Sequence, residues 1–167
     1  MEYRIEDTFD VSAQAYWDIF FSDEYNAELW PALDIKREVL KFEKTGEGND
    51  LVIVREQRLT PKREVPKVLQ TLVKGAITYV EKNNYRAADS AMKTVTIPSF
   101  GADRIDNHGL YRVEPRGDDK CARIWEGHCS ARIALLGGKL EKFLVGEIKE
   151  SYRKATEFTR SYHAKHR

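Results

Sequence analysis

Apolar and polar residues alternate at the start of the chain. In residues 2–10, Tyr3, Ile5 and Phe9 fall on one side, and charged or hydroxyl-bearing residues fall on the other. A period of two places the apolar side chains on one face of an extended segment. The pattern therefore predicts a half-buried strand.

Two short helices are expected after this strand. Ser12 is a residue type that caps helix starts, and apolar residues follow it at helical spacing over residues 13–20. The segment from Ser22 to Glu24 starts a second helix. We expect this helix to end at Trp30-Pro31, because the residue before a proline is disfavoured in a helix.

Most of the remaining chain has the pattern of strands separated by turns. Arg116 to Asp119 is a strong turn sequence, and residues 65–73 have the spacing of a short helix that ends at Gly75. The facing of one strand stays open, because two cations share the parity of Ile35 and Val39. The predicted strands cover residues 33–43, 51–59, 76–86, 92–98, 106–115 and 120–134.

The final segment has the longest periodic pattern. After Gly137-Gly138, apolar residues recur at steps of three and four and predict a helix over residues 138–163. Consecutive strands with short connections favour an antiparallel sheet, which needs a cover on one face. We therefore predict an α+β fold: a curved antiparallel sheet of about seven strands wrapped on this helix. Residues 1–167 form one domain in this prediction.

Composition excludes several classes of protein. The chain has 167 residues, a net charge of +1, and 41% hydrophobic and 33% charged residues. No segment approaches the roughly 18 apolar residues of a membrane span, and the charged start is unlike a secretory signal. A near-zero net charge argues against nucleic-acid binding. We expect a monomer.

The cysteines and histidines predict neither a disulfide nor a metal site. Cys121 and Cys129 fall on one predicted strand, too far apart to bond, so we expect free thiols in the cytoplasm. None of the four histidines has metal-ligand spacing, and no catalytic motif is present. We therefore predict no metal, no cofactor and no catalytic residue.

Three segments carry a family resemblance. The stretch ARIALLGGKLEK at residues 131–142 resembles the strand-to-helix junction of the DUF2505 group, within the START/Bet v 1-like (SRPBCC) helix-grip superfamily. It is also similar to the junction of VASt/Aster sterol-transfer domains. Residues 65–69 and 109–117 are similar to the DUF2505 group as well. The resemblance implies a deep hydrophobic cavity that binds a lipid or another apolar molecule.

Strand parity and the helical stripe indicate which residues would line such a cavity. On the last strand, residues with the parity of Trp125 face the helix, since charged groups stay in water unless paired. Glu147 lies beside the apolar stripe and either binds a ligand polar group or pairs with Lys139, Arg153 or Lys154. Each position is also compatible with plain core packing. The candidate ligand-binding residues are Trp30, Tyr79, Tyr111, Trp125, Cys129, Phe143 and Glu147.

Three functions are compatible with this prediction. The first is a non-catalytic module that binds, carries or senses a lipid-like ligand. The second is a cyclase or hydrolase that uses polar cavity residues, among which Arg123 has inward parity unless it lies past the sheet edge. The third is a protein-interaction module. Transient membrane contact fits the first, through the apolar tips Phe20-Phe21 and Phe100-Gly101 or the basic residues 153–167.

Overall fold

Seven antiparallel strands form a single sheet in the order β1-β7-β6-β5-β4-β3-β2. The computed structural model describes all residues, 1–167. Every strand neighbours the next one in sequence except at β1, which pairs with β7, so the predicted meander is confirmed. The strands are β1 (Glu2–Phe9), β2 (Ile35–Thr45), β3 (Val52–Pro61), β4 (Tyr79–Arg86), β5 (Ala91–Pro98), β6 (Ile105–Pro115) and β7 (Cys121–Ala131).

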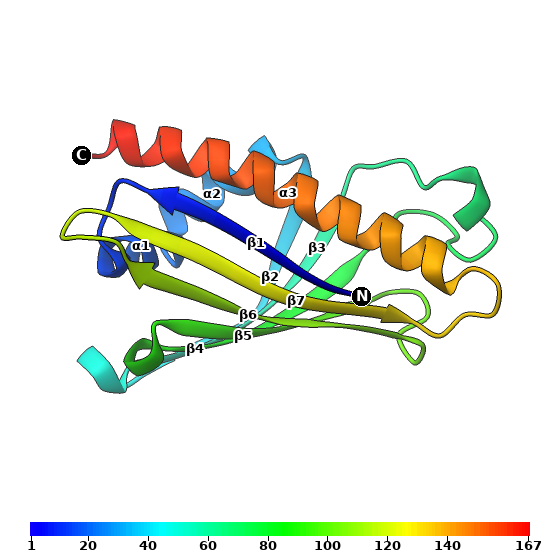
Figure 1. Cartoon of the computed structure of the whole chain (residues 1–167), viewed down its shortest axis with the longest axis horizontal. Coiled ribbons are helices and arrows are strands. Elements are labelled where there is room, and N and C mark those ends of the chain that lie inside the picture. Colours follow the sequence, from blue (N-terminus) through cyan, green and yellow to red (C-terminus); the bar gives the residue numbers. More distant parts are fainter.

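One long helix covers this sheet. Helix α3 (Gly137–Lys165) crosses one face, while α1 (Ala13–Phe20) and α2 (Asp23–Ala32) connect β1 to β2 at one end (Figure 1). Three 3₁₀ turns complete the fold: η1 (Gly48–Asp50), η2 (Lys67–Leu69) and η3 (Ala87–Asp89). This arrangement confirms the predicted α+β fold. None of the helices is both long and apolar enough to cross a membrane.

The two helix caps form as predicted. The Ser12 and Ser22 hydroxyls accept hydrogen bonds from backbone N–H groups three residues ahead, at 3.1 and 3.3 Å. Helix α2 continues past its predicted end, because Pro31 lies in the last turn, where its missing N–H removes only one helical bond. The chain then leaves the helix at Asp34, which has a φ of 55°.

The predicted helix over residues 65–73 is wrong, because only the 3₁₀ turn η2 forms there. Leu69 and Val73 are both buried, so their spacing reflects two anchors of an irregular loop. Gly75 then turns the chain with a φ of 84°. Two strands are shorter than predicted: β4 starts at Tyr79 and β7 ends at Ala131.

The structure resolves the facing of β2 by dividing the strand in two. Ile35 is buried and Arg37 is half-buried, so the first part faces the interior. A bulge then shifts the pairing register between Val39 and Lys41. Beyond it the strand is exposed on both sides, and a single parity over residues 33–43 does not describe it.

Candidate functional site

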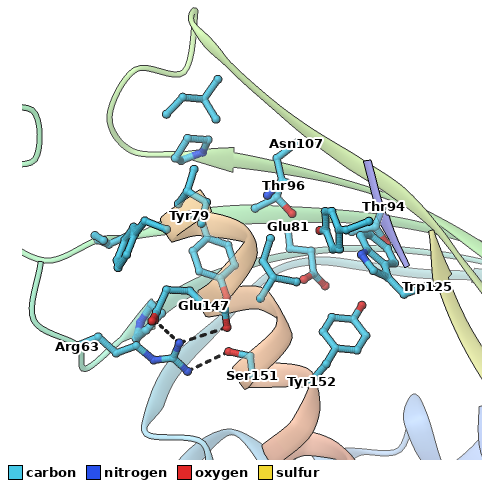
Figure 2. A pocket seen from close by; sticks show the side chains of 18 residues that line it. Arg63, Tyr79, Glu81, Thr94, Thr96, Asn107, Trp125, Glu147, Ser151 and Tyr152 are labelled. Atoms are coloured by element: carbon cyan, nitrogen blue, oxygen red, sulfur yellow. Dashed lines mark hydrogen bonds and ion pairs between the residues drawn. The ribbon is translucent and has the colours of Figure 1, made fainter. Parts of the chain in front are cut away.

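A cavity lies between the first half of α3 and strands β4 to β7 (Figure 2). Its volume is about 140 Å³, and we call it the α3 chamber. The helix contributes apolar side chains, among them Phe143, Leu144 and Ile148. The sheet contributes the polar side chains of Glu81, Thr94, Thr96 and Asn107. The helix side of the chamber is mainly apolar, apart from Glu147 and Ser151, and the sheet side mixes polar and apolar residues.

A second cavity continues from the first toward α1 and α2. It has a volume of about 120 Å³, and we call it the α2 chamber. Two arginines, Arg55 and Arg123, lie in its wall, together with aromatic residues of the helices. The two chambers adjoin, since five residues line both: Tyr79, Glu81, Thr94, Ser151 and Tyr152.

Six of the seven candidate residues line one chamber or the other. Trp125, Phe143 and Glu147 line the α3 chamber, Trp30 and Tyr111 line the α2 chamber, and Tyr79 lines both. Cys129 has the expected inward facing but lines neither chamber, because it is fully buried in the core cluster that contains Trp125. Burial raises the pKa of its thiol to about 11, as it does for Cys121. Both cysteines are free.

Glu147 has a partner that the sequence did not indicate. Arg63, from the loop between β3 and β4, forms an ion pair with the Glu147 carboxylate. The Arg63 Nη2 also donates to the Ser151 Oγ at 2.9 Å. The expected pairing of Glu147 with Lys139, Arg153 or Lys154 is wrong, since Arg153 binds Glu150 and Glu157 instead. Arg63 and Glu147 thus link the loop to α3 beside the chamber (Figure 2).

Two buried polar atoms beside the α3 chamber have no hydrogen-bond partner. They are the Tyr3 hydroxyl and the Trp125 indole Nε1, on side chains that both line the chamber. Burial raises the pKa of Tyr3 to about 12, and the neighbouring Trp125 indole offsets part of this rise, so the hydroxyl stays protonated and lies near the indole N–H. Buried polar groups are nearly always satisfied, so an unpaired pair beside a cavity indicates a place for a ligand's polar atom.

A polar network that the sequence analysis missed covers the inner face of the sheet. Arg55 Nε donates to Asn83 Oδ1 at 3.0 Å, and Asn83 Nδ2 donates to Thr94 Oγ1 at 3.0 Å. One row further, Gln57 Nε2 donates to Glu81 Oε1 at 3.0 Å. The available signal was parity, since residues 55 and 57 alternate in step with the buried Ile53 and Leu59.

Arg123 lies inside the molecule and not past the sheet edge. Its side chain is only 3% exposed and forms an ion pair with Asp7. Its Nη2 also donates to the Thr156 Oγ1 at 2.6 Å, and its guanidinium lies 4.8 Å from the centre of the Tyr152 ring. Its Nε is buried without a partner.

The aromatic tips considered for membrane contact are packed against the protein. Phe20 and Phe21 pack on the main core, and Phe100 packs on a smaller cluster with Leu69 and Leu140. The exposed apolar side chains lie elsewhere, with Leu135 fully exposed in the loop before α3. The predicted tips are therefore structural.

Solved structures with this architecture cover nearly the whole chain. A START superfamily protein from Mycobacterium smegmatis matches with a TM-score of 0.63 and 16% identity, over 96% of this chain and 97% of that one. The ZhuI aromatase/cyclase from Streptomyces sp. R1128 matches with a TM-score of 0.65 and 11% identity, over 97% and 92%. Norcoclaurine synthase from Thalictrum flavum, in complex with dopamine and hydroxybenzaldehyde, matches with a TM-score of 0.56 and 16% identity, over 95% and 86%.

These likenesses show a START/Bet v 1-like helix-grip fold. Residues 4–162 match the family model DUF2505, a protein of unknown function, and the chain belongs to that family. A search of curated proteins found no significant match.

Proposed function

We propose that this protein binds a small, largely apolar molecule with at least one polar group in its two adjoining chambers. The observation that carries the proposal is the unpaired Tyr3 hydroxyl and Trp125 indole N–H beside the α3 chamber. A ligand oxygen there would satisfy both donors, and the apolar wall of α3 would cover the ligand's hydrocarbon part. Affinity would come mainly from apolar burial, at about 25 cal/mol per Å² before the costs of association.

The size of the chambers limits the ligand. Volumes of about 140 and 120 Å³ fall below the ~300 Å³ at which pockets for drug-sized molecules begin. We therefore propose a molecule with one or two rings or a medium-length chain, and not a whole phospholipid. The helix-grip fold also occurs in norcoclaurine synthase, whose structure holds dopamine and hydroxybenzaldehyde.

A cyclase-type enzyme is the second candidate. It is favoured by Glu81, Tyr79 and Tyr152, which meet where the chambers join. Burial raises the pKa of both tyrosines, so they would act as neutral hydrogen-bond donors beside the one carboxylate. A solid core would have favoured the protein-interaction hypothesis, and the two cavities do not favour it.

The cellular setting belongs to the same proposal. We propose a monomer in the cytoplasm that touches a membrane surface only briefly, when the ligand is loaded or released. Exposed Leu135 and Val68 supply apolar contacts for this step, and Lys67 and Lys139 supply exposed cations.

A cavity-filling variant tests the binding proposal. Ile148 lines the α3 chamber, and Ile148→Trp would place a larger side chain in it. Lys149→Trp adds the same side chain at the adjacent exposed position and is the matched control. After incubation with a total lipid extract, native mass spectrometry should find a discrete adduct on the wild type and on Lys149→Trp, and little on Ile148→Trp. A folded wild type without any adduct would overturn the proposal, and an adduct whose mass changes with time would favour the enzyme.

A further inference from the structure

Two guanidinium groups are buried in the wall of the α2 chamber. Arg55 and Arg123 are each 2% exposed, and both line the chamber. They come from β3 and β7, which lie well apart in the strand order, so the curvature of the sheet brings them to one cavity. Arginine is almost never fully buried unless it is paired, so the partners of each guanidinium show whether it has donors left for a ligand.

Arg55 is not saturated by the protein. Its Nε donates to Asn83, but its two terminal nitrogens make no hydrogen bond, and the Glu81 carboxylate is 3.9 Å from Nη2. The faces of the Phe20 and Phe21 rings lie 5.1 and 5.3 Å from the guanidinium carbon. Burial lowers the pKa of Arg55 to about 10, which leaves it charged at neutral pH. Arg55 therefore keeps free donors in a cavity shielded from water.

Arg123 is neutralised on one side only. Its Nη2 binds Asp7 and Thr156, while its Nε is buried without a partner. The hydroxyls of Tyr16 and Tyr111, which line the same chamber, hydrogen-bond to each other. Burial raises the pKa of both tyrosines, so neither provides a negative charge.

The carboxylates around the chamber leave hydrogen-bond donors unsatisfied. Arg55 and Arg123 line it with Glu81, and Asp7 approaches Arg123 from outside the lining. Arg37 lies next to this group, where its Nε donates to the neutral amide of Gln57 at 2.7 Å. Asp23 lies close enough to Arg37 to offset part of the lowering of its pKa by burial, so three cations face three carboxylates. The Glu81 carboxylate stays 3.9 Å from Arg55 Nη2, and the terminal donors of Arg55 are left without a hydrogen bond.

We propose that the α2 chamber holds the carboxylate of an otherwise apolar ligand, bound by the free terminal donors of Arg55, with Arg123 in the same wall. A carboxylate accepts hydrogen bonds from these donors, and its planar oxygens match the geometry of a guanidinium. The apolar body of the ligand then lies in the adjoining α3 chamber, against Phe143 and Ile148. The inference rests on the proposed function and names the chemical class of its ligand as a small organic acid.

Matched acids and alcohols test this inference. Decanoic acid and decanol share one apolar body, and naphthoic acid and naphthylmethanol share another. Isothermal titration calorimetry at neutral pH should show each acid binding the wild type about tenfold more tightly than its alcohol, as expected for a charge-assisted hydrogen bond. Equal affinities for acid and alcohol would overturn the inference and leave the binding proposal standing. Failure of both ligand pairs to bind would overturn the inference and count against the binding proposal.

A charge-removing variant locates the effect. Arg55→Gln should abolish the preference for the acid and change the affinity for the alcohol less than about twofold. The matched control is Arg58→Gln, on the same strand but exposed and paired with Glu38, which should keep the full preference. Arg55→Lys retains the charge and should keep part of the preference, which covers the case in which Arg55→Gln does not fold. A preference for the acid that survives in Arg55→Gln would overturn the assignment to this chamber.

Discussion

At the scale of single residues, His163 shows how burial converts a side chain into a pH-sensitive element. Its ring is 3% exposed and packs edge-on against Phe9 and Tyr16, with centroids 5.7 and 6.0 Å away. Neither ring nitrogen has a hydrogen-bond partner. Burial, together with a smaller effect of the Arg167 charge, lowers the pKa of His163 to about 4. The folded protein therefore keeps this histidine neutral.

The consequence is a loss of stability in mild acid. As pH falls from about 6.5 to about 4, the unfolded chain binds a proton at His163 and the folded chain does not. The free energy of unfolding should fall across this window by up to about 3 kcal/mol and stay nearly constant above it. Urea unfolding at several pH values measures this. His163→Phe should flatten the profile, and His166→Gln, exposed three residues away, should not. An unchanged slope in His163→Phe would contradict the assignment.

At the scale of elements, two paired glycines shape the centre of the sheet. Gly109 on β6 and Gly127 on β7 are register partners, and the Trp125 ring lies over both. A Cβ on Gly127 would be 2.4 Å from the Tyr3 ring and 2.5 Å from the Trp125 Nε1. The packing of two aromatic rings therefore requires a glycine at position 127.

Alanine substitutions distinguish the tight packing of aromatic rings on Gly127 from the general cost of a glycine in a helix. Gly127→Ala should lower the free energy of unfolding by about 1–3 kcal/mol, because the buried rings must shift. Gly146→Ala should raise it by about 0.5–1 kcal/mol, because it lies within α3 with open space around it. Urea unfolding measures both, and near-ultraviolet circular dichroism reports the Trp125 ring in Gly127→Ala. Equal stability of the two variants would rule out this packing account.

Elements with long uniform patterns could be predicted, and those with local irregularities could not. The strands and α3 were recognised because a period of 2 or 3.6 continues over many residues. The segment 65–73 has only two pairs of apolar residues between Pro66 and Gly75. An irregular loop that buries two of its side chains has the same spacing as a short helix. The bulge in β2 carries no mark in the sequence, so a single facing for that strand was not predictable.

The sequence predicted which side chains of the site face inward, but not which residues form their ion pairs. Parity placed Trp125, Tyr111 and Tyr79 on the inner face, and the chambers include all three. Arg123 and Asp7 are 116 residues apart, and Arg63 and Glu147 are 84 apart, so only the folded structure shows these ion pairs. The inward arginine of β3 was missed because hydrophobicity assigns charged side chains to solvent, and here a network of polar neighbours holds one inside.

At the scale of the whole molecule, the two halves of α3 have different supports. The second half is fastened to the fold, since Thr156 binds Arg123, Thr159 binds the Tyr25 hydroxyl at 2.7 Å, and Tyr162 is buried. The first half lies over the α3 chamber, and its chamber-lining residues 143–152 are only partly buried. The start of the helix is held by Leu140, which is fully buried, but the stretch that covers the chamber has less support than the second half.

This asymmetry predicts where the molecule opens. Backbone amides of residues 143–152 should exchange with solvent faster than those of residues 154–161, because less packing must be broken to expose them. A bound ligand fills the chamber beneath the first segment, so it should slow exchange there and leave the second segment nearly unchanged. Native-state hydrogen exchange followed by mass spectrometry, with and without decanoic acid, measures both effects. Slower exchange over residues 143–152 than over 154–161 in the free protein would mean that access to the cavity does not depend on the first half of α3.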